Sequence, residues 1–386
     1  MRILDESLHH PFRSLTIVLI YVMLFSVVCD AQTLPTENSE ESMLAEWVRT
    51  IGVSRGDCKK CHPSEVAAWM KSTHFRSADL RLFAKDANTQ KYVAALNIDH
   101  QELATTSVCA SCHGTQAIRR DQVVVLGGIS CEKCHGPAGG ENGWLNRHQS
   151  YDADRVIPRT LETAEHRAER LKECNKAGMI RSDNLYDLAK ACYRCHLVNN
   201  EDLVAAGHRL ASAFDFVSWS DGEVRHNFFM NRDVNADAPS LWLETTGNSV
   251  QNRRRLKFVV GALVQLEMGL RARAATTNPV LVPQIGGMIA AANGKVSQIS
   301  GVAPTADLAE VTSAVNSLMA TLFVPLPDDA QKYSLVADDI SKVTKQFLKD
   351  HDGSELSGVD ALLVLLQPHY SQHFIDRYRS AGDGVK

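Results

Sequence analysis

Apolar residues follow a helical period in the C-terminal part of the chain. From about residue 250 onwards they recur at intervals of three and four, the pattern of helices that bury one face. Pro368 is expected to kink the last helix, because proline has no N–H to continue the helical hydrogen bonds. Residues 250–386 are therefore predicted to form an α-helical bundle, which carries no cofactor signature. The predicted helices span residues 256–275, 283–299, 305–322, 329–349 and 359–379.

The preceding part of the chain is less regular. Residues 64–82 carry a loose helical stripe, and the Glu/Arg-rich residues 163–177 predict a polar helix. Residues 122–126 have strand character, and the Gly-rich residues 136–143 predict a loop. We therefore expect a mainly α protein with little regular sheet, in which a first domain at residues 32–249 precedes the bundle.

The N-terminus has the pattern of an export signal. A charged leader precedes an unbroken apolar run at residues 15–29, and a polar stretch follows Ala31. This arrangement predicts a secretory signal peptide at residues 1–31, cleaved after Ala31. A lipoprotein anchor at Cys29 is disfavoured, because Val28 is bulky where a small residue is needed. The mature chain is then expected in the periplasm or otherwise outside the cytoplasm.

The same run is too short to favour a membrane anchor. A helix that spans a bilayer needs about 20 apolar residues, and no other segment reaches that length. No stable membrane insertion is therefore expected after cleavage. The charge balance, with 41 Lys+Arg against 45 Asp+Glu, gives no basic excess for nucleic acid.

Cysteine spacing identifies the candidate chemistry. Eight of the ten cysteines fall into four Cys-x-x-Cys-His motifs, the attachment signature of c-type haem. The two thiols add to the porphyrin vinyl groups, and the adjacent histidine binds the iron. Zinc sites and disulfides give no reason for a histidine beside every pair. Four covalently bound c-type haems are therefore predicted, at Cys58/Cys61/His62, Cys109/Cys112/His113, Cys131/Cys134/His135 and Cys192/Cys195/His196.

Four further histidines are predicted to supply the second axial ligands: His74, His148, His208 and His226. His74 follows His62 by twelve residues, so a continuous helix between them would make His74 serve a different haem. His100 and Met230 are weaker alternatives. His369 and His373 lie four residues apart on one predicted helix face, a spacing that packing explains better than a metal does. Cys174 is expected to be a buried free thiol.

The second and third motifs are only 22 residues apart, so their haems are expected nearly to touch.

Two segments resemble the tetrahaem cytochrome c-554 family. They are residues 58–74, which run from the first motif to Trp69 and His74, and residues 128–140, followed by His148. The resemblance covers roughly residues 55–230 and leaves the bundle outside. It implies haems packed in stacked pairs and periplasmic electron transfer, notably from hydroxylamine oxidation.

The resemblance also carries expectations about ligands. It implies His74 and His148 as distal ligands, and a five-coordinate second haem, which here is the one on His113. One family ligand lies shortly before the fourth motif, whereas residues 167–195 of this chain contain no histidine. His208 and His226 follow the fourth motif instead.

These features predict a periplasmic tetrahaem electron carrier that exchanges electrons with donor and acceptor proteins. No catalytic residue is assigned. One alternative is a haem enzyme in which an open iron reduces or oxidises nitric oxide, nitrite or hydroxylamine. Another is a structural subunit of a larger haem complex. The number of plausible distal histidines favours the carrier.

Overall fold

The computed structural model describes residues 40–53, 58–84, 86–105, 107–141, 143–149, 162–211, 214–224, 249–324 and 330–380. The predicted signal peptide, His226 and Met230 lie outside these residues. A short unit, Met1–Met43, is separate from a second unit, Leu44–Lys386, which is the one discussed below. The domain boundary predicted at residues 249/250 adjoins a segment outside the described residues and stays a prediction.

The fold class is confirmed, because the described residues are mainly helical and contain one two-stranded sheet. We call residues 44–224 the motif region, since they hold all four Cys-x-x-Cys-His motifs. Its elements are α1 (Glu40–Arg49), α2 (Cys58–Cys61), α3 (Pro63–Trp69), α4 (Thr73–Arg81), α5 (Ala87–Ala95), η1 (Glu102–Ala104), α6 (Val108–His113), β1 (Gln116–Arg119), β2 (Gln122–Val125), α7 (Cys131–His135), α8 (Trp144–Gln149), α9 (Ala164–Lys176), α10 (Leu185–His196), α11 (Glu201–Ala205) and α12 (Phe216–Asp221).

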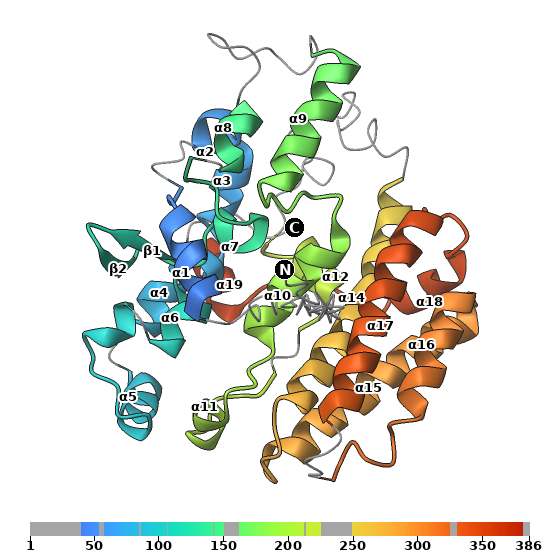
Figure 1. Cartoon of the computed structure of the whole chain (residues 1–386). Helices are drawn as coiled ribbons and strands as arrows, with labels where there is room; N and C mark the ends of the chain where they lie inside the picture. The colour runs from blue at the N-terminus through green and yellow to red at the C-terminus, as the bar shows by residue number, and fades with distance from the viewer. Residues whose placement is uncertain are drawn as a thin grey trace, which may run out of the picture. The chain divides into compact units, whose positions relative to one another are not determined.

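We call the following helices, up to Leu363, the bundle. They are α14 (Val250–Ala274), α15 (Leu281–Val302), α16 (Ala306–Asn316), α17 (Ala330–Asp350), η5 (Ser357–Val359) and α18 (Asp360–Leu363). The first four predicted helices are confirmed, although α16 ends six residues earlier than expected. Figure 1 shows them side by side in gold to red.

The prediction of one kinked helix at residues 359–379 was wrong. Residues 364–371 separate α18 from a last helix, α19 (Gln372–Ser380). Proline lacks the N–H that a helix needs and disfavours helical backbone in the residue before it. Pro368 therefore breaks the helix, and we call residues 364–380 the C-terminal arm.

Helix α14 is the centre of the hydrophobic core. It packs against α15 and α17 on the bundle side and against α10 and α12 of the motif region. Its apolar residues are buried on every face, for example Val260, Leu263 and Leu266, which have no exposed surface. A helix whose apolar residues are buried on every face is expected at the centre of a fold.

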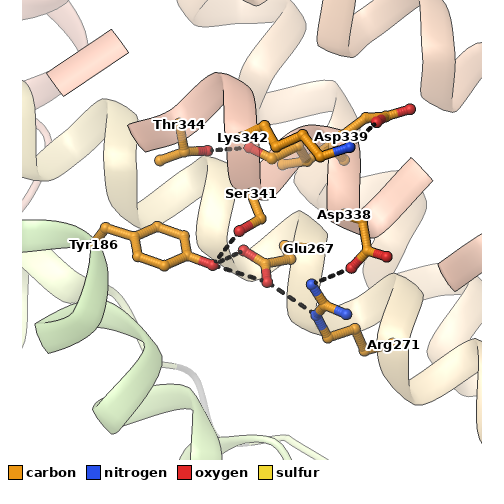
Figure 2. Close-up of polar contacts among 9 residues, drawn as sticks. Tyr186, Glu267, Arg271, Asp338, Asp339, Ser341, Lys342 and Thr344 are labelled. Carbon is orange, nitrogen blue, oxygen red and sulfur yellow. Dashed lines mark hydrogen bonds and ion pairs between the residues drawn. The ribbon is translucent and has the colours of Figure 1, made fainter. Parts of the chain in front are cut away.

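A buried polar cluster joins α10 to the bundle (Figure 2). The phenol of Tyr186 on α10 donates to Glu267 of α14 at 2.8 Å and lies 2.7 Å from the hydroxyl of Ser341 on α17. Arg271 bonds Glu267 at 2.9 Å and Asp338 at 2.9 Å. Because Glu267 is fully buried, these partners supply the hydrogen bonds that water would otherwise give.

The predicted strand at 122–126 is β2, and its antiparallel partner β1 was not predicted. Arg120 and Asp121 form the turn with φ of 48° and 60°, the left-handed conformation that two-residue hairpins need. Residues 64–82 form two helices instead of one. The break is at Ser72, whose hydroxyl accepts the N–H of Phe75 at 3.3 Å and starts α4.

Candidate haem sites

Each Cys-x-x-Cys-His motif lies in a helical turn. The first three motifs lie in α2, α6 and α7 or directly after them, and the fourth ends α10. Residues three and four apart share one face of a helix. The helical turn thus brings the two cysteines of a motif and its histidine to one side, as a covalently held haem requires. The side chain of Cys61 lies outside the described residues.

The structure places a second histidine ring beside three of the four motif histidines. The ring centres of His62 and His148 are 5.9 Å apart. Those of His74 and His196 are 6.2 Å apart, and those of His113 and His208 are 6.3 Å apart. An iron–imidazole bond is about 2 Å long, so two imidazoles on opposite sides of one iron have centres about 6 Å apart. The three separations therefore suit axial pairs.

Burial keeps several of these imidazoles neutral. Desolvation lowers the pKa of His113 to about 4 and the pKa of His196 to about 3. The pKa of His74 is also lowered by burial, although the nearby Glu223 opposes the shift. Neutral imidazole is the form that binds a metal, so the described environment favours ligation.

The first pair joins α8 to the first motif. His148 lies on α8, and the indole of Trp144 packs edge-on against its ring at 6.0 Å. Trp144 also donates to the carbonyl of Gly136 at 3.1 Å. This bond ties α8 to the residue that follows the third motif. The first and the third motif therefore both lie close to α8.

The second pair joins His208 to the second motif. His208 lies just after α11 and directly after Gly207. The φ of Gly207 is 97°, a backbone conformation that favours glycine. Its Nδ1 lies 2.9 Å from the carbonyl of Arg209, and Tyr92 packs against its ring at 5.7 Å. The structure brings His208 to His113, and the five-coordinate second haem that the resemblance implies stays a prediction.

The third pair links α4 to the end of α10. His74 is the second residue of α4, and its ring faces His196. His74 thus lies beside the fourth motif histidine and not beside His62, and its service to a haem stays a prediction. Trp219 packs against His196 at 4.7 Å and His74 at 6.2 Å. No sequence signal distinguished Trp219 beforehand.

The remaining motif histidine, His135, is oriented by the backbone. Its Nδ1 lies 2.8 Å from the carbonyl of Ile180. Such a hydrogen bond holds the ring and leaves Nε2 to a metal. His226, the fourth predicted distal ligand, lies outside the described residues.

The electrostatics of the cysteines indicate which motifs adjoin. The nearby Cys58 raises the pKa of Cys131, and Cys112 and Cys195 likewise shift each other's pKa. The first motif thus adjoins the third, and the second adjoins the fourth. Helices α7 and α10 are also in contact, which brings the third motif to the fourth. Close contact of the second and third haems stays a prediction.

Two histidines that lie beside no motif histidine have other partners. His166 lies 2.9 Å from Glu162, and His369 stacks on Trp219 with ring centres 4.2 Å apart. His100 is exposed. Cys174 is a free thiol with no exposed surface, as predicted.

Motifs on helical turns, with histidines facing three of them, are the arrangement of a c-type cytochrome, which holds its haem covalently. Residues 57–136 match the family model described as cytochrome c554 and c-prime. The match contains the first three motifs and confirms the resemblance over these residues. No curated protein and no solved structure matches the chain.

Proposed function

We propose that the chain is an exported tetrahaem cytochrome that passes electrons between redox partner proteins. The observation that carries this proposal is the set of three histidine pairs at 5.9, 6.2 and 6.3 Å. An iron with two protein ligands has no position for substrate, so it transfers electrons and does not bind a reactant. The haems would supply the redox chemistry, and the chain would hold and tune them.

The ligand assignment follows from the pairs. His148 serves the first haem, His208 the second and His74 the fourth. By elimination among the predicted distal histidines, His226 serves the third haem. All four irons are then six-coordinate, and this count supports a carrier over an enzyme with an open iron.

The order of the haems follows from the contacts between motifs. The nearness of Cys58 to Cys131 supports a first–third haem pair, and that of Cys112 to Cys195 supports a second–fourth pair. The packing of α7 on α10 connects the two pairs. Electrons would thus pass in the order first, third, fourth and second haem, or the reverse.

Export is proposed from the predicted signal peptide and from the typical location of proteins with this family model. Within the ranges that the structure describes, no helix has the length and apolar character needed to cross a membrane. The redox partners are expected to be proteins in the same compartment.

The test is electron paramagnetic resonance of the oxidised holoprotein, repeated with nitric oxide on the reduced form. Mass spectrometry first counts the attached haems, and four are expected. Four low-spin signals without a nitrosyl adduct support the carrier. A high-spin signal that binds nitric oxide would refute full ligation and support the enzyme alternative.

Single variants test the assignment. His148→Gly, His208→Gly and His74→Gly should each convert one haem to a high-spin form that binds nitric oxide. His100→Asn is the matched control, because His100 is exposed, and it should leave the spectrum unchanged. A distal variant that behaves like this control is not a ligand.

A further inference from the structure

Glu223 occupies a position between two helix N-termini. It lies two residues beyond the end of α12, after Gly222, and only 3% of its surface is exposed. One carboxylate oxygen accepts the N–H of Thr73, the first residue of α4, at 2.8 Å. The other accepts the N–H of Ser371, which precedes α19, at 2.7 Å. The hydroxyls of Thr73 and Ser371 also bond each other.

The two helices explain how a buried carboxylate is tolerated there. Among the described residues, no lysine or arginine pairs with Glu223. Helix N-termini carry a partial positive charge and unsatisfied N–H groups, both of which stabilise an anion. Burial alone would raise the pKa of Glu223, but the hydrogen bonds from Ser371 and Thr73 hold it below its ordinary value. The group is therefore an anion at neutral pH.

The first of these helices carries His74. His74 directly follows Thr73, and its ring faces His196 at 6.2 Å. The backbone of His74 is also held on the side of the third motif, because its carbonyl accepts the N–H of Ile129 at 2.8 Å. The start of α4, and with it the imidazole, is thus fixed from two sides.

The second helix belongs to the C-terminal arm. The N–H of Glu223 donates to the carbonyl of His369 at 2.9 Å, and the N–H of His369 donates to Ser218 at 2.8 Å. A Cβ on Gly222 would collide with the backbone of His369, so the approach requires glycine. The arm therefore leaves the bundle and returns to the segment that ends in Glu223.

We propose that Glu223 is a positioning residue for the fourth haem: it clamps α4 to the C-terminal arm, sets His74 opposite His196, and lowers the reduction potential of that haem through its buried negative charge. The inference rests on the proposed function, in which His74 is the distal ligand. A negative charge near an iron stabilises the ferric state, which carries one positive charge more than the ferrous state.

The test is Glu223→Gln in the full holoprotein. Glutamine keeps the shape, removes the charge and turns an NH₂ towards one of the two N–H donors. We expect a raised midpoint potential and altered low-spin g values for one haem, with the other three unchanged. His74→Gly identifies which haem this is.

Two further variants separate positioning from general stability. Asp221→Asn removes a buried carboxylate from the same segment, but Asp221 pairs with Arg254 and Lys257 of α14 and not with α4. It should lower stability without moving the fourth haem's potential. Glu223→Asp retains the negative charge, so the midpoint potential of the fourth haem should stay close to the wild-type value.

The outcomes distinguish the two proposals. If His74→Gly leaves all haems low-spin, the ligand assignment in the proposed function fails. If His74→Gly changes one haem but Glu223→Gln shifts neither its potential nor its g values, only the role of Glu223 is overturned. Equal effects of Glu223→Gln and Asp221→Asn on that haem would also overturn it.

Discussion

Tyr186→Phe tests whether the helix of the fourth motif is held to the bundle by a buried hydrogen bond. The substitution removes the phenol oxygen and changes little else. That oxygen lies 2.8 and 3.0 Å from the carboxylate of Glu267 and 2.7 Å from Ser341 (Figure 2). Burial raises the pKa of Tyr186, so the phenol stays protonated and donates.

The expected cost follows from the partner's charge. A hydrogen bond to a charged group contributes about 1.5–3 kcal/mol. Glu267 keeps Arg271 at 2.9 Å when the phenol is lost, so it is not left unpaired. We therefore expect Tyr186→Phe to lower the free energy of unfolding by about 2 kcal/mol.

The assay is denaturant unfolding followed by two probes. The Soret band reports the motif region, and far-UV circular dichroism reports mainly the helices. Tyr193→Phe is the matched control, because Tyr193 also lies on α10 and bonds a carbonyl of α14, that of Gly261, at a long 3.4 Å. The control should cost less than about 1 kcal/mol. Equal midpoints for the two variants would refute the reasoning.

Two further predictions concern backbone contact and charge. Gly128→Ala should lower the yield of holoprotein and destabilise it by about 2 kcal/mol or more, because a Cβ would collide with the carbonyls of His74 and Phe75. Thermal unfolding measures the loss, and an unfolding midpoint equal to that of the wild type would contradict the prediction. Arg170 holds the pKa of Glu162 at about 2, against 4.5 ordinarily. The ion pair of Glu162 with Arg170, screened in part by solvent, contributes on the order of 1–2 kcal/mol, which is complete above pH 4.5 and lost as the pH falls towards 2. Glu162→Gln should thus destabilise the protein at pH 7 and less at pH 3 in urea titrations, and a constant difference would contradict the shift.

Haem attachment could be predicted because its chemistry is local. Each motif places both cysteines and the proximal histidine within five consecutive residues, and any helical turn then orients them together. The bundle helices were also predictable, since burying one face imposes a period on the sequence. The ends of these helices were harder to predict, as at α16, because the last turns of a helix depend on tertiary contacts.

Some local structure was hidden from the pattern. β1 was not predicted, because Gln116 and Ala117 are both buried and the strand shows no alternation. The last predicted helix was wrong because Pro368 breaks it, and the arm that results reaches Glu223. That contact joins residues nearly 150 positions apart, which no local pattern encodes.

The sequence by itself determined the cofactor chemistry, the helical class and the set of candidate distal histidines. Only the tertiary structure decided which histidine faces which motif: His148 with His62, His74 with His196, and His208 with His113. The physical reason is that a proximal ligand is fixed by covalent proximity in the chain. A distal ligand depends on which separate helices pack together.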